Sequence, residues 1–500
     1  MAGEPGRPQR VLLAVYLDSH FNELIRVARL LRDSGRYAPA VAFAREYPAR
    51  ARDVETCARE SIECVGARGE ALVAGDGTAA AAPAPMTVRA RRGLRRAVRR
   101  LSPRLEAALH GLAVHLVEEN LVTALPLRLR EVRRSLRGAR ALVARVRPDL
   151  VVLAEDTVEY GTAALIRAAH EQGAPSVIVP FTVATAEEPA ETYAGARRFQ
   201  VRGLGNRLLA LIAPRWAHEH RGRRLVRQPA PRALALEVLG LAPPRPWTVH
   251  SGAADRIAVE SERMLDLYRQ QGLPEDRLVP TGAPYDDVLA AARAAAPARR
   301  AALLRELGLD AALPLVVSAL PPDQMGSRAG ACAFSTYEEL VAAWVDALAA
   351  SGAWNVVLTA HPRVRPGDLR LPDHPRVRLA ARDTAELVPL ADLFVASASA
   401  TIRWAIAGGV PVVNYDVYGY GYADYRDCPG VLAAESREEF ATILGSLGGG
   451  PGPRAVMAAA QARDAPRWGT LDGRAGARLL ALFDTLTGAE GSPAAGGGTP

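Results

Sequence analysis

The sequence predicts an α/β protein built from two doubly wound halves, and three observations lead to this prediction. Short apolar runs typical of buried strands alternate with segments whose apolar residues recur at helical spacing, as in β-α-β units with a parallel sheet. The chain has 500 residues, which is too long for one hydrophobic core, so we expect two domains. An Ala- and Arg-rich connector over residues 290–308 separates two such alternating series.

The first series begins with the apolar run RVLLAVY, which a polar turn, DSHFN, follows. The apolar run PDLVVLAED then leads through a helical pattern to PSVIVPF, which predicts one right-handed β-α-β unit. The strands expected in this series lie at 10–16, 38–43, 148–156, 175–181, 255–261 and 277–289, and the helices at 23–35, 162–174 and 261–274.

The second series has the same alternation. Its expected strands lie at 313–320, 354–362, 377–380, 392–399 and 410–416, and its helices at 335–352, 383–391 and 401–409. We therefore expect an N-terminal domain over 8–300, with a basic helical insertion (about 86–147) and an irregular insertion (about 190–250), and a C-terminal domain over 301–465, a helix over 466–485 and a disordered tail over 486–500.

The composition is that of an ordinary globular protein, with 49% apolar and 23% charged residues. No stretch approaches the roughly 20 apolar residues of a membrane span, and the N-terminus lacks the pattern of a signal peptide. We expect a cytoplasmic protein. Its four cysteines form no C-x-x-C pair, so buried free thiols are favoured over metal sites or disulfides.

All 62 basic residues are arginine, and the net charge is +8. With the heavy use of Ala, Gly and Pro, this suggests a GC-rich bacterial genome. Segment 89–100 carries seven arginines, and 127–147 continues the pattern, which predicts a pair of basic amphipathic helices. These arginines could contact an anionic membrane surface or a lipid-linked phosphate, or only solvent. Nucleic acid is not an expected partner, because aromatic residues make up 5% and none lies among the arginines.

Polar residues follow several predicted strands at the point where each strand ends. In open parallel sheets, ligands bind beyond the carboxyl ends of the strands. DSHFNE, EDTVEYG, HPR and SASAT occupy four such ends. If the two halves face each other across a cleft, all four segments line it.

In the C-terminal half, Ser397, Ser399 and Thr401 stand where a helix is expected to begin. Hydroxyl side chains and unpaired backbone N–H groups there could hold a phosphate, and an ordinary N-cap is the alternative. His361 could donate a hydrogen bond to the same phosphate.

Pro362 fixes the chain direction behind His361, and Arg363 could add a bidentate contact. Asp416, in a tyrosine-rich segment, could bind a base or sugar ring, and a loop packed on the surface is an equal reading.

In the N-terminal half, His20 lies in the first βα turn and could act as general base toward an acceptor hydroxyl, with a capping role as the alternative. Glu155, Asp156 and Glu159 follow the strand at 148–156. Each could serve as the base or bind acceptor hydroxyls, and at least one is expected only to cap the next helix. No G-x-G-x-x-G follows either opening strand, so we expect no dinucleotide cofactor, and no metal site is expected.

Three segments resemble the GT-B superfamily of nucleotide-sugar enzymes, in the branch of UDP-N-acetylglucosamine 2-epimerase and bacterial surface-polysaccharide transferases. Residues 148–179 are similar to its "PD-apolar-GDT" segment, residues 255–289 to its strand, helix and "TGNP-x-x-D", and residues 391–416 to its "DSGG…EA…G-x-P-V" segment. The His-Pro pair before a serine motif is similar to what capsule, sialic-acid and glycerophosphate transferases use to hold a cytidine nucleotide. The resemblance implies a GT-B fold of two Rossmann-like domains that face across a cleft.

The chain departs from the epimerases at three places. Leu320-Pro321-Pro322 replaces their T-x-H-R histidine, Pro180-Phe181-Thr182 replaces their H-x-E-A-G glutamate, and Arg403-Trp404 replaces their ribose-binding glutamate. These losses disfavour epimerase chemistry.

We therefore expect a metal-independent, inverting glycosyltransferase that joins a nucleotide-activated sugar to a glycan or lipid-linked acceptor. Capsule or other cell-envelope polysaccharide assembly at the inner membrane face would be its setting. The alternatives are a CDP-glycerol-type glycerophosphotransferase, an epimerase-like isomerase and a non-catalytic nucleotide-binding module.

Overall fold

The computed structural model describes residues 7–45, 47–74, 119–180, 186–328, 330–350, 352–361, 364, 367, 369–421 and 425–488. The chain divides into two compact units, which are described separately. Unit 1 comprises the residues up to Ile257, Leu273–Val279 and the described residues from Leu480 onward, and unit 2 comprises Ala258–Gly272 and Pro280–Leu479. This division differs from the boundary predicted near residue 300, because the residues between 280 and 300 belong to unit 2.

Unit 1 is built on a seven-stranded sheet with the order β3-β2-β1-β4-β5-β8-β9. The pairs from β3 through to β8 are parallel. Val11, Leu12 and Leu13 of β1 are buried, as a strand covered on both faces requires. The strands are β1 (Gln9–Val15), β2 (Tyr37–Phe43), β3 (Glu63–Val65), β4 (Leu150–Leu153), β5 (Ser176–Ile178), β8 (Arg256–Val259) and β9 (Leu278–Pro280).

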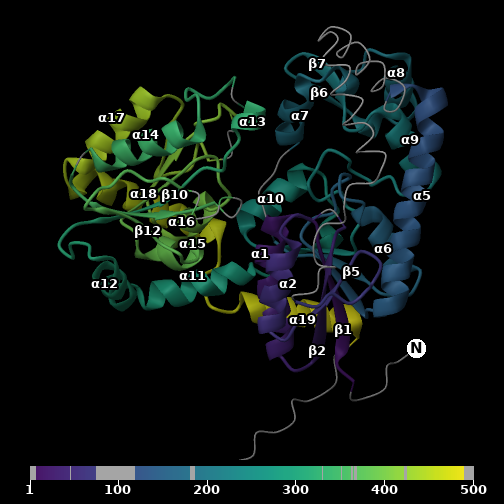
Figure 1. Ribbon diagram of the computed structural model, residues 1–500, viewed down its shortest axis with the longest axis horizontal. Coiled ribbons are helices and arrows are strands. Elements are labelled where there is room, and N and C mark those ends of the chain that lie inside the picture. Colours follow the sequence, from purple (N-terminus) through teal and green to yellow (C-terminus); the bar gives the residue numbers. More distant parts are fainter. Residues whose placement is uncertain are drawn as a thin grey trace, which may run out of the picture. The chain divides into compact units, whose positions relative to one another are not determined.

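Helices cover both faces of this sheet. In Figure 1, α1 and α2 lie on one side of the sheet and α5 and α6 on the other. Helix α5, the second of the two predicted basic helices, packs along α6 and α9. The bounds are α1 (Asp18–Asp33), α2 (Arg50–Arg59), α5 (Leu121–Val146), α6 (Thr162–His170) and α10 (Glu262–Gln270), of which α10 belongs to unit 2. The first predicted basic helix, 89–100, lies outside the described residues.

The segment predicted to be an irregular insertion, 190–250, is regular in large part, so that prediction was wrong. It contains helices α8 and α9 and an antiparallel hairpin, β6–β7, and Trp216 is fully buried beneath them. The many arginines and prolines divide this segment into short apolar stretches. Each stretch is too short to show the periodicity of a helix or a strand. The elements are α7 (Glu187–Ala194), α8 (Leu204–Ile212), β6 (Ala217–His220), β7 (Arg223–Val226) and α9 (Ala230–Val238).

Unit 2 is built on a six-stranded sheet with the order β12-β11-β10-β13-β14-β15, in which all pairs are parallel. Side chains alternate between its faces with a period of two. Val316 and Val395 join one core with Trp344, whereas Val317 and Phe394 join the core on the other face. The strands are β10 (Leu315–Ala319), β11 (Asn355–Thr359), β12 (Val377–Leu379), β13 (Leu393–Ala396), β14 (Val412–Tyr415) and β15 (Val431–Ala434).

The helices of unit 2 complete the doubly wound arrangement. Helices α14 and α17 pack against each other, and α16 packs on α18. The helices are α11 (Pro284–Ala294), α12 (Ala296–Leu307), α13 (Met325–Arg328), α14 (Tyr337–Ala349), α15 (Thr384–Leu387), α16 (Ile402–Gly408), α17 (Arg437–Gly448) and α18 (Pro451–Trp468). The prediction of an α/β protein with two Rossmann-like domains is confirmed.

The C-terminal region differs in detail from its prediction. The helix expected over 466–485 begins only at Ala475 and forms α19 (Ala475–Thr487), because α18 ends at Trp468 and Gly469 and Gly473 follow. The predicted disordered tail lies outside the described residues from position 489. Cys57 and Cys64 are buried free thiols, as predicted, whereas Cys332 and Cys428 are only partly buried.

Candidate functional site

Each sheet has one point at which the chain crosses from one side of its first strand to the other. Strands β1, β2 and β3 extend unit 1 in one direction and β4 lies on the opposite side of β1, so that the crossing falls between β1 and β4. The same crossing in unit 2 falls between β10 and β13. Crevices at such crossings, beyond the carboxyl ends of the strands, are where doubly wound folds bind ligands.

His20 and Glu155 meet at the crossing in unit 1. Leu13 and Ala14 of β1 pair with Val152 and Leu153 of β4, so these two strands end at the same level. His20 lies in the first turn of α1, which begins earlier than predicted, and its Nε2 is 2.8 Å from Glu155 Oε1. Both side chains are buried. Nε2 is thus the ring nitrogen of His20 that faces the carboxyl group of Glu155.

Two tyrosines surround the ring of His20. Tyr16 and Tyr160 contact its edge, with ring centroids 6.3 and 5.7 Å away, and the two tyrosines stack on each other at 5.7 Å. Gly161 adopts φ = +76° directly after Tyr160 and turns the chain into α6. The aromatic rings keep water from the His20–Glu155 pair on this side, which strengthens its electrostatic interaction.

Asp156 makes different contacts from its neighbour Glu155. Its carboxylate accepts backbone N–H hydrogen bonds from Ser251, Ala253 and Ala254, the last two at 2.8 and 3.2 Å. Burial raises the pKa of Asp156, and these three donors oppose that rise. The oxygens of Asp156 therefore hold the loop at 251–254 in place before β8.

Glu159 belongs to a charged network with Arg227 and Tyr193. Arg227 Nη1 donates to Glu159 Oε1 at 2.7 Å and to the Tyr193 hydroxyl at 2.9 Å, and that hydroxyl donates to Glu159. Burial opposes the charged form of Glu159, but Arg227 and Tyr193 outweigh it and hold the pKa below its ordinary value. Of the three carboxylates predicted as candidates, only Glu155 contacts His20.

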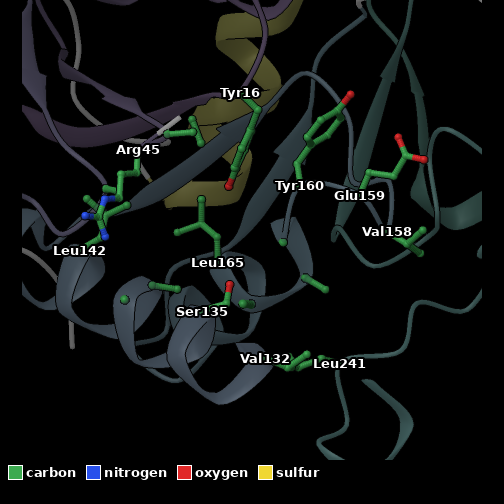
Figure 2. A pocket seen from close by; sticks show the side chains of 18 of the residues that line it. Tyr16, Arg45, Val132, Ser135, Leu142, Val158, Glu159, Tyr160, Leu165 and Leu241 are labelled. Carbon is green, nitrogen blue, oxygen red and sulfur yellow. The ribbon is translucent and has the colours of Figure 1, made fainter. Parts of the chain in front are cut away.

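A cavity of about 610 Å³ opens beside this crossing. It lies between the carboxyl ends of β1, β2 and β4 and helix α5 (Figure 2). Tyr16, Glu159 and Tyr160 line it, as do apolar side chains such as Leu142 and Leu165. The pair of tyrosines thus lies between the cavity and His20.

In unit 2, the loop at 397–401 follows β13 at the other crossing. Ser397 is buried, and its hydroxyl has no hydrogen-bond partner among the described residues. Ala398 has a left-handed conformation, φ = +43°, and its N–H donates to Asn414 Oδ1 at 2.9 Å. The hydroxyls of Ser399 and Thr401 are 2.8 Å apart. Three hydroxyl groups thus lie in one short loop.

The backbone N–H groups of this loop are less available than predicted. The N–H of Thr401 donates to Ser399 Oγ, and those of Ile402 and Arg403 donate to the carbonyl groups of Ser399 and Ala400. Since the first turn of α16 closes on itself in this way, hydroxyl groups rather than the start of the helix are the groups that a phosphate would meet.

His361 lies on the same edge of this sheet. Thr359, the last residue of β11, pairs with Ala319 of β10, and Val395 of β13 pairs with Ser318. His361 and Ala398 therefore follow two strands, β11 and β13, that end at nearly the same level. Because β10 lies between these two strands, their ends are about 10 Å apart at the usual strand spacing. Pro362 and Arg363 lie outside the described residues.

Asp416 organises the tyrosine-rich segment. Its carboxylate accepts the N–H groups of Tyr420 and Gly421 at 3.0 and 2.7 Å. Tyr415 and Tyr418 are buried in the core, and the Tyr418 hydroxyl donates to the carbonyl of Pro322 at 2.6 Å. The carboxylate of Asp416 therefore holds the backbone turn at Tyr420 and Gly421.

A buried ion pair next to the 397–401 loop was not predicted. Arg403 of α16 pairs with Glu260, which follows β8, and the guanidinium lies 4.9 Å from the centre of the Tyr285 ring. Arg403 stands where the resemblance places a ribose-binding glutamate, and its charge is held by Glu260. Nothing in the segment SASATIRWAIAGG indicates that Arg403 has a buried partner elsewhere in the chain.

Two features are absent from the residues that the structure describes. No three His, Cys, Asp or Glu side chains in this part of the chain are grouped so that they could hold a metal ion. Within the same residues, no helix has the length and apolar character needed to cross a membrane.

Neither a protein-family model nor a curated protein sequence matches the chain. Solved structures do. The S. aureus MnaA-UDP co-structure aligns with a TM-score of 0.51 at 10% identity, covering 98% of this chain and 100% of that one. The calicheamicin glycosyltransferase CalG4 aligns with a TM-score of 0.50 at 15% identity, covering 97% and 100%. A candidate UDP-N-acetylglucosamine 2-epimerase from Listeria monocytogenes aligns with 0.50 at 12%, covering 97% and 98%. With its two parallel sheets of seven and six strands, the chain has the GT-B fold.

Proposed function

We propose that the protein is a glycosyltransferase that moves a sugar from a nucleotide-activated donor to a hydroxyl group of an acceptor, in bacterial cell-surface polysaccharide or glycoconjugate assembly. The observation that carries the proposal is the buried His20–Glu155 pair at the crossing between β1 and β4, beside a cavity of about 610 Å³. A histidine oriented by a carboxylate is the usual form of a general base for a hydroxyl nucleophile.

The reaction would proceed by direct displacement. With Nε2–H donated to Glu155, His20 takes the proton of the acceptor hydroxyl on Nδ1 as its oxygen attacks the anomeric carbon. The bond from that carbon to the phosphate oxygen breaks, and the nucleotide leaves with the electron pair. Glu155 stabilises the imidazolium that forms. Because His20 is fully buried, the hydroxyl must pass the groups that cover it, and Tyr16 and Tyr160 are those on the cavity side.

Unit 2 would hold the leaving nucleotide. The hydroxyl of Ser397 and the paired hydroxyls of Ser399 and Thr401 are suited to donate hydrogen bonds to phosphate oxygens. His361, at the same edge of the sheet, would contribute a further donor about two strand spacings away, which suits the length of a diphosphate. Hydrogen bonds to the developing charge on the phosphate stabilise the transition state more than the ground state.

A nucleotide screen tests this proposal. The melting temperature of the protein is measured with UDP, GDP, dTDP, CDP and CMP, and a nucleotide at a hundred times its Kd should add about 2.7 kcal/mol of stability. His361→Ala should reduce the shift, whereas His218→Ala, a change on hairpin β6–β7, should not. A response to CMP with release of CMP in turnover would indicate a glycerophosphotransferase, and conversion of UDP-N-acetylglucosamine would indicate an epimerase. No response to any nucleotide would overturn the proposal.

We also propose contact with an anionic membrane surface. Helix α5 exposes Arg130, Arg133 and Arg137. Helix α8 exposes four large apolar side chains, Leu204, Leu208, Leu211 and Ile212. An amphipathic helix with apolar residues outward and arginines nearby is typical of proteins that lie on the membrane interface. Co-sedimentation with vesicles that contain phosphatidylglycerol, but not with purely zwitterionic vesicles, is the expected result.

A further inference from the structure

The wall of the unit 1 cavity is apolar in large part. Apolar side chains from α5, α6, α9 and the residues after α9 line it, among them Val132, Leu142, Leu165, Leu236 and Leu241. A volume of about 610 Å³ lies in the range of sites that enclose most of a small organic molecule. These apolar side chains favour a ligand with an apolar body, because its burial against them removes apolar surface from water.

Positive charge is concentrated at the same cavity. Arg45, Arg68 and Arg134 line it and are exposed. Within the part of the chain that the structure describes, none of these three guanidinium groups forms an ion pair. The three acidic side chains of the lining are already engaged: Glu131 pairs with Arg232, Glu159 pairs with Arg227, and Asp156 accepts backbone N–H groups. The cavity therefore has a net positive charge that an acidic group on a ligand would neutralise.

The cavity also leads toward the catalytic pair of the proposed function. Tyr16 and Tyr160 line it (Figure 2). Both tyrosine rings also make edge contacts with the ring of His20. A ligand whose apolar body lies against these rings would have its near end beside His20.

We propose that this cavity binds the acceptor, and that the acceptor is an apolar molecule that carries an acidic group, a phosphate or a carboxylate. The inference rests on the proposed function for the role of acceptor, and on the cavity alone for the chemistry of the ligand. Arg45, Arg68 and Arg134 hold the acidic group by charge-assisted hydrogen bonds, and the apolar body lies against the leucines and the tyrosine pair.

Gly138 offers a clean way to block the cavity. It lies inside helix α5 and lines the cavity, and a Cβ atom placed on it meets no atom within 4 Å. The Cβ atom of Gly138→Leu therefore meets no neighbour, and its side chain should occupy part of the cavity; leucine also favours a helix more than glycine does. Gly445→Leu is the matched control, since Gly445 lies in α17 of unit 2 and its Cβ position is equally open.

The experiment measures the binding of four probes by calorimetry: 2-naphthyl phosphate, 2-naphthoate, 2-naphthol and inorganic phosphate. The phosphate and carboxylate probes should bind at least about tenfold more tightly than naphthol, because charge-assisted hydrogen bonds are gained, and more tightly than inorganic phosphate. Gly138→Leu should weaken both acidic probes about tenfold or more, whereas Gly445→Leu should leave them within about twofold. Arg134→Gln should weaken the acidic probes and leave naphthol unchanged.

Equal binding of naphthol and naphthyl phosphate, unchanged binding in Gly138→Leu, or no binding of any probe would overturn the inference. UDP, GDP, dTDP, CDP and CMP are titrated into the same preparations to keep the two proposals apart. Nucleotide binding without probe binding rejects the acidic acceptor and leaves the transferase proposal standing. Probe binding that depends on Gly138, without any nucleotide binding, supports the ligand chemistry and rejects the transferase.

Discussion

Replacing Arg403 with methionine removes one partner of the buried ion pair in unit 2. The side chains of Arg403 and Glu260 are only 2% and 1% exposed, so Glu260 would be left as an unpaired buried carboxylate. Removing one partner of such a pair costs about 3–5 kcal/mol. The contact of the guanidinium with Tyr285, at 4.9 Å, is lost as well and adds about 0.5–2 kcal/mol.

The structure predicts which variants of this ion pair lose more stability and which lose less. Glu260→Gln should cost less than Arg403→Met, because the contact with Tyr285 stays. Replacing both Arg403 and Glu260 with methionine should recover most of the loss, since no charge remains buried. Arg467→Met is the control, because Arg467 is 44% exposed and pairs with surface carboxylates that contribute about 0–1 kcal/mol.

The assay is unfolding by heat and by urea, with the free energy of unfolding compared at equal m-values. For a unit of about 200 residues, a loss of 3–5 kcal/mol lowers the melting temperature by roughly 6–20 °C. If Arg403→Met were no more destabilising than Arg467→Met, the ion pair would not hold α16 and the loop before it, and this reasoning would be refuted.

Three further predictions concern the separate parts of the molecule. Ser397→Ala should keep the stability within about 1 kcal/mol, because the hydroxyl has no partner among the described residues, and should weaken nucleotide binding about tenfold; unchanged nucleotide affinity would contradict the role of this hydroxyl. Because Arg227 holds the pKa of Glu159 below its ordinary value of 4.5, Glu159 stabilises the fold at neutral pH and loses this contribution as pH falls through the lowered pKa. The difference in unfolding free energy between wild type and Glu159→Gln should therefore shrink below about pH 4.5, and a constant difference would be the contrary result. Replacing Leu211 and Ile212 with glutamate should abolish co-sedimentation with anionic vesicles, and undiminished binding would exclude α8 as the contact.

The sequence predicts the elements that depend on local pattern. The run at 355–359 is apolar and β-branched, and it forms a buried strand with His361 beyond its end. Ligands bind beyond the carboxyl ends of parallel strands, and this rule brought His20, Glu155, His361 and the serine loop into consideration.

Contacts that depend on long-range packing could not be predicted from the sequence. From the sequence alone, Glu155, Asp156 and Glu159 are equivalent candidates for the catalytic base. They differ because Asp156 meets the backbone of the loop at 251–254, Glu159 meets Arg227, and only Glu155 meets a residue 135 positions away, His20. The same holds for Arg403, whose partner lies on another part of the chain. The acidic-ligand cavity is likewise formed by segments that carry no shared motif.

In the reaction that we propose, His20 and Glu155 act together as the base that activates the acceptor. Sugar transfer is measured for His20→Ala, Glu155→Gln and the double variant, in preparations whose nucleotide binding is unchanged. General-base catalysis contributes about 10²–10⁴-fold, and residues that act as a unit have non-additive effects, so the double variant should be about as slow as His20→Ala alone. Losses that multiply in the double variant, or transfer by His20→Ala at the wild-type rate, would contradict the account.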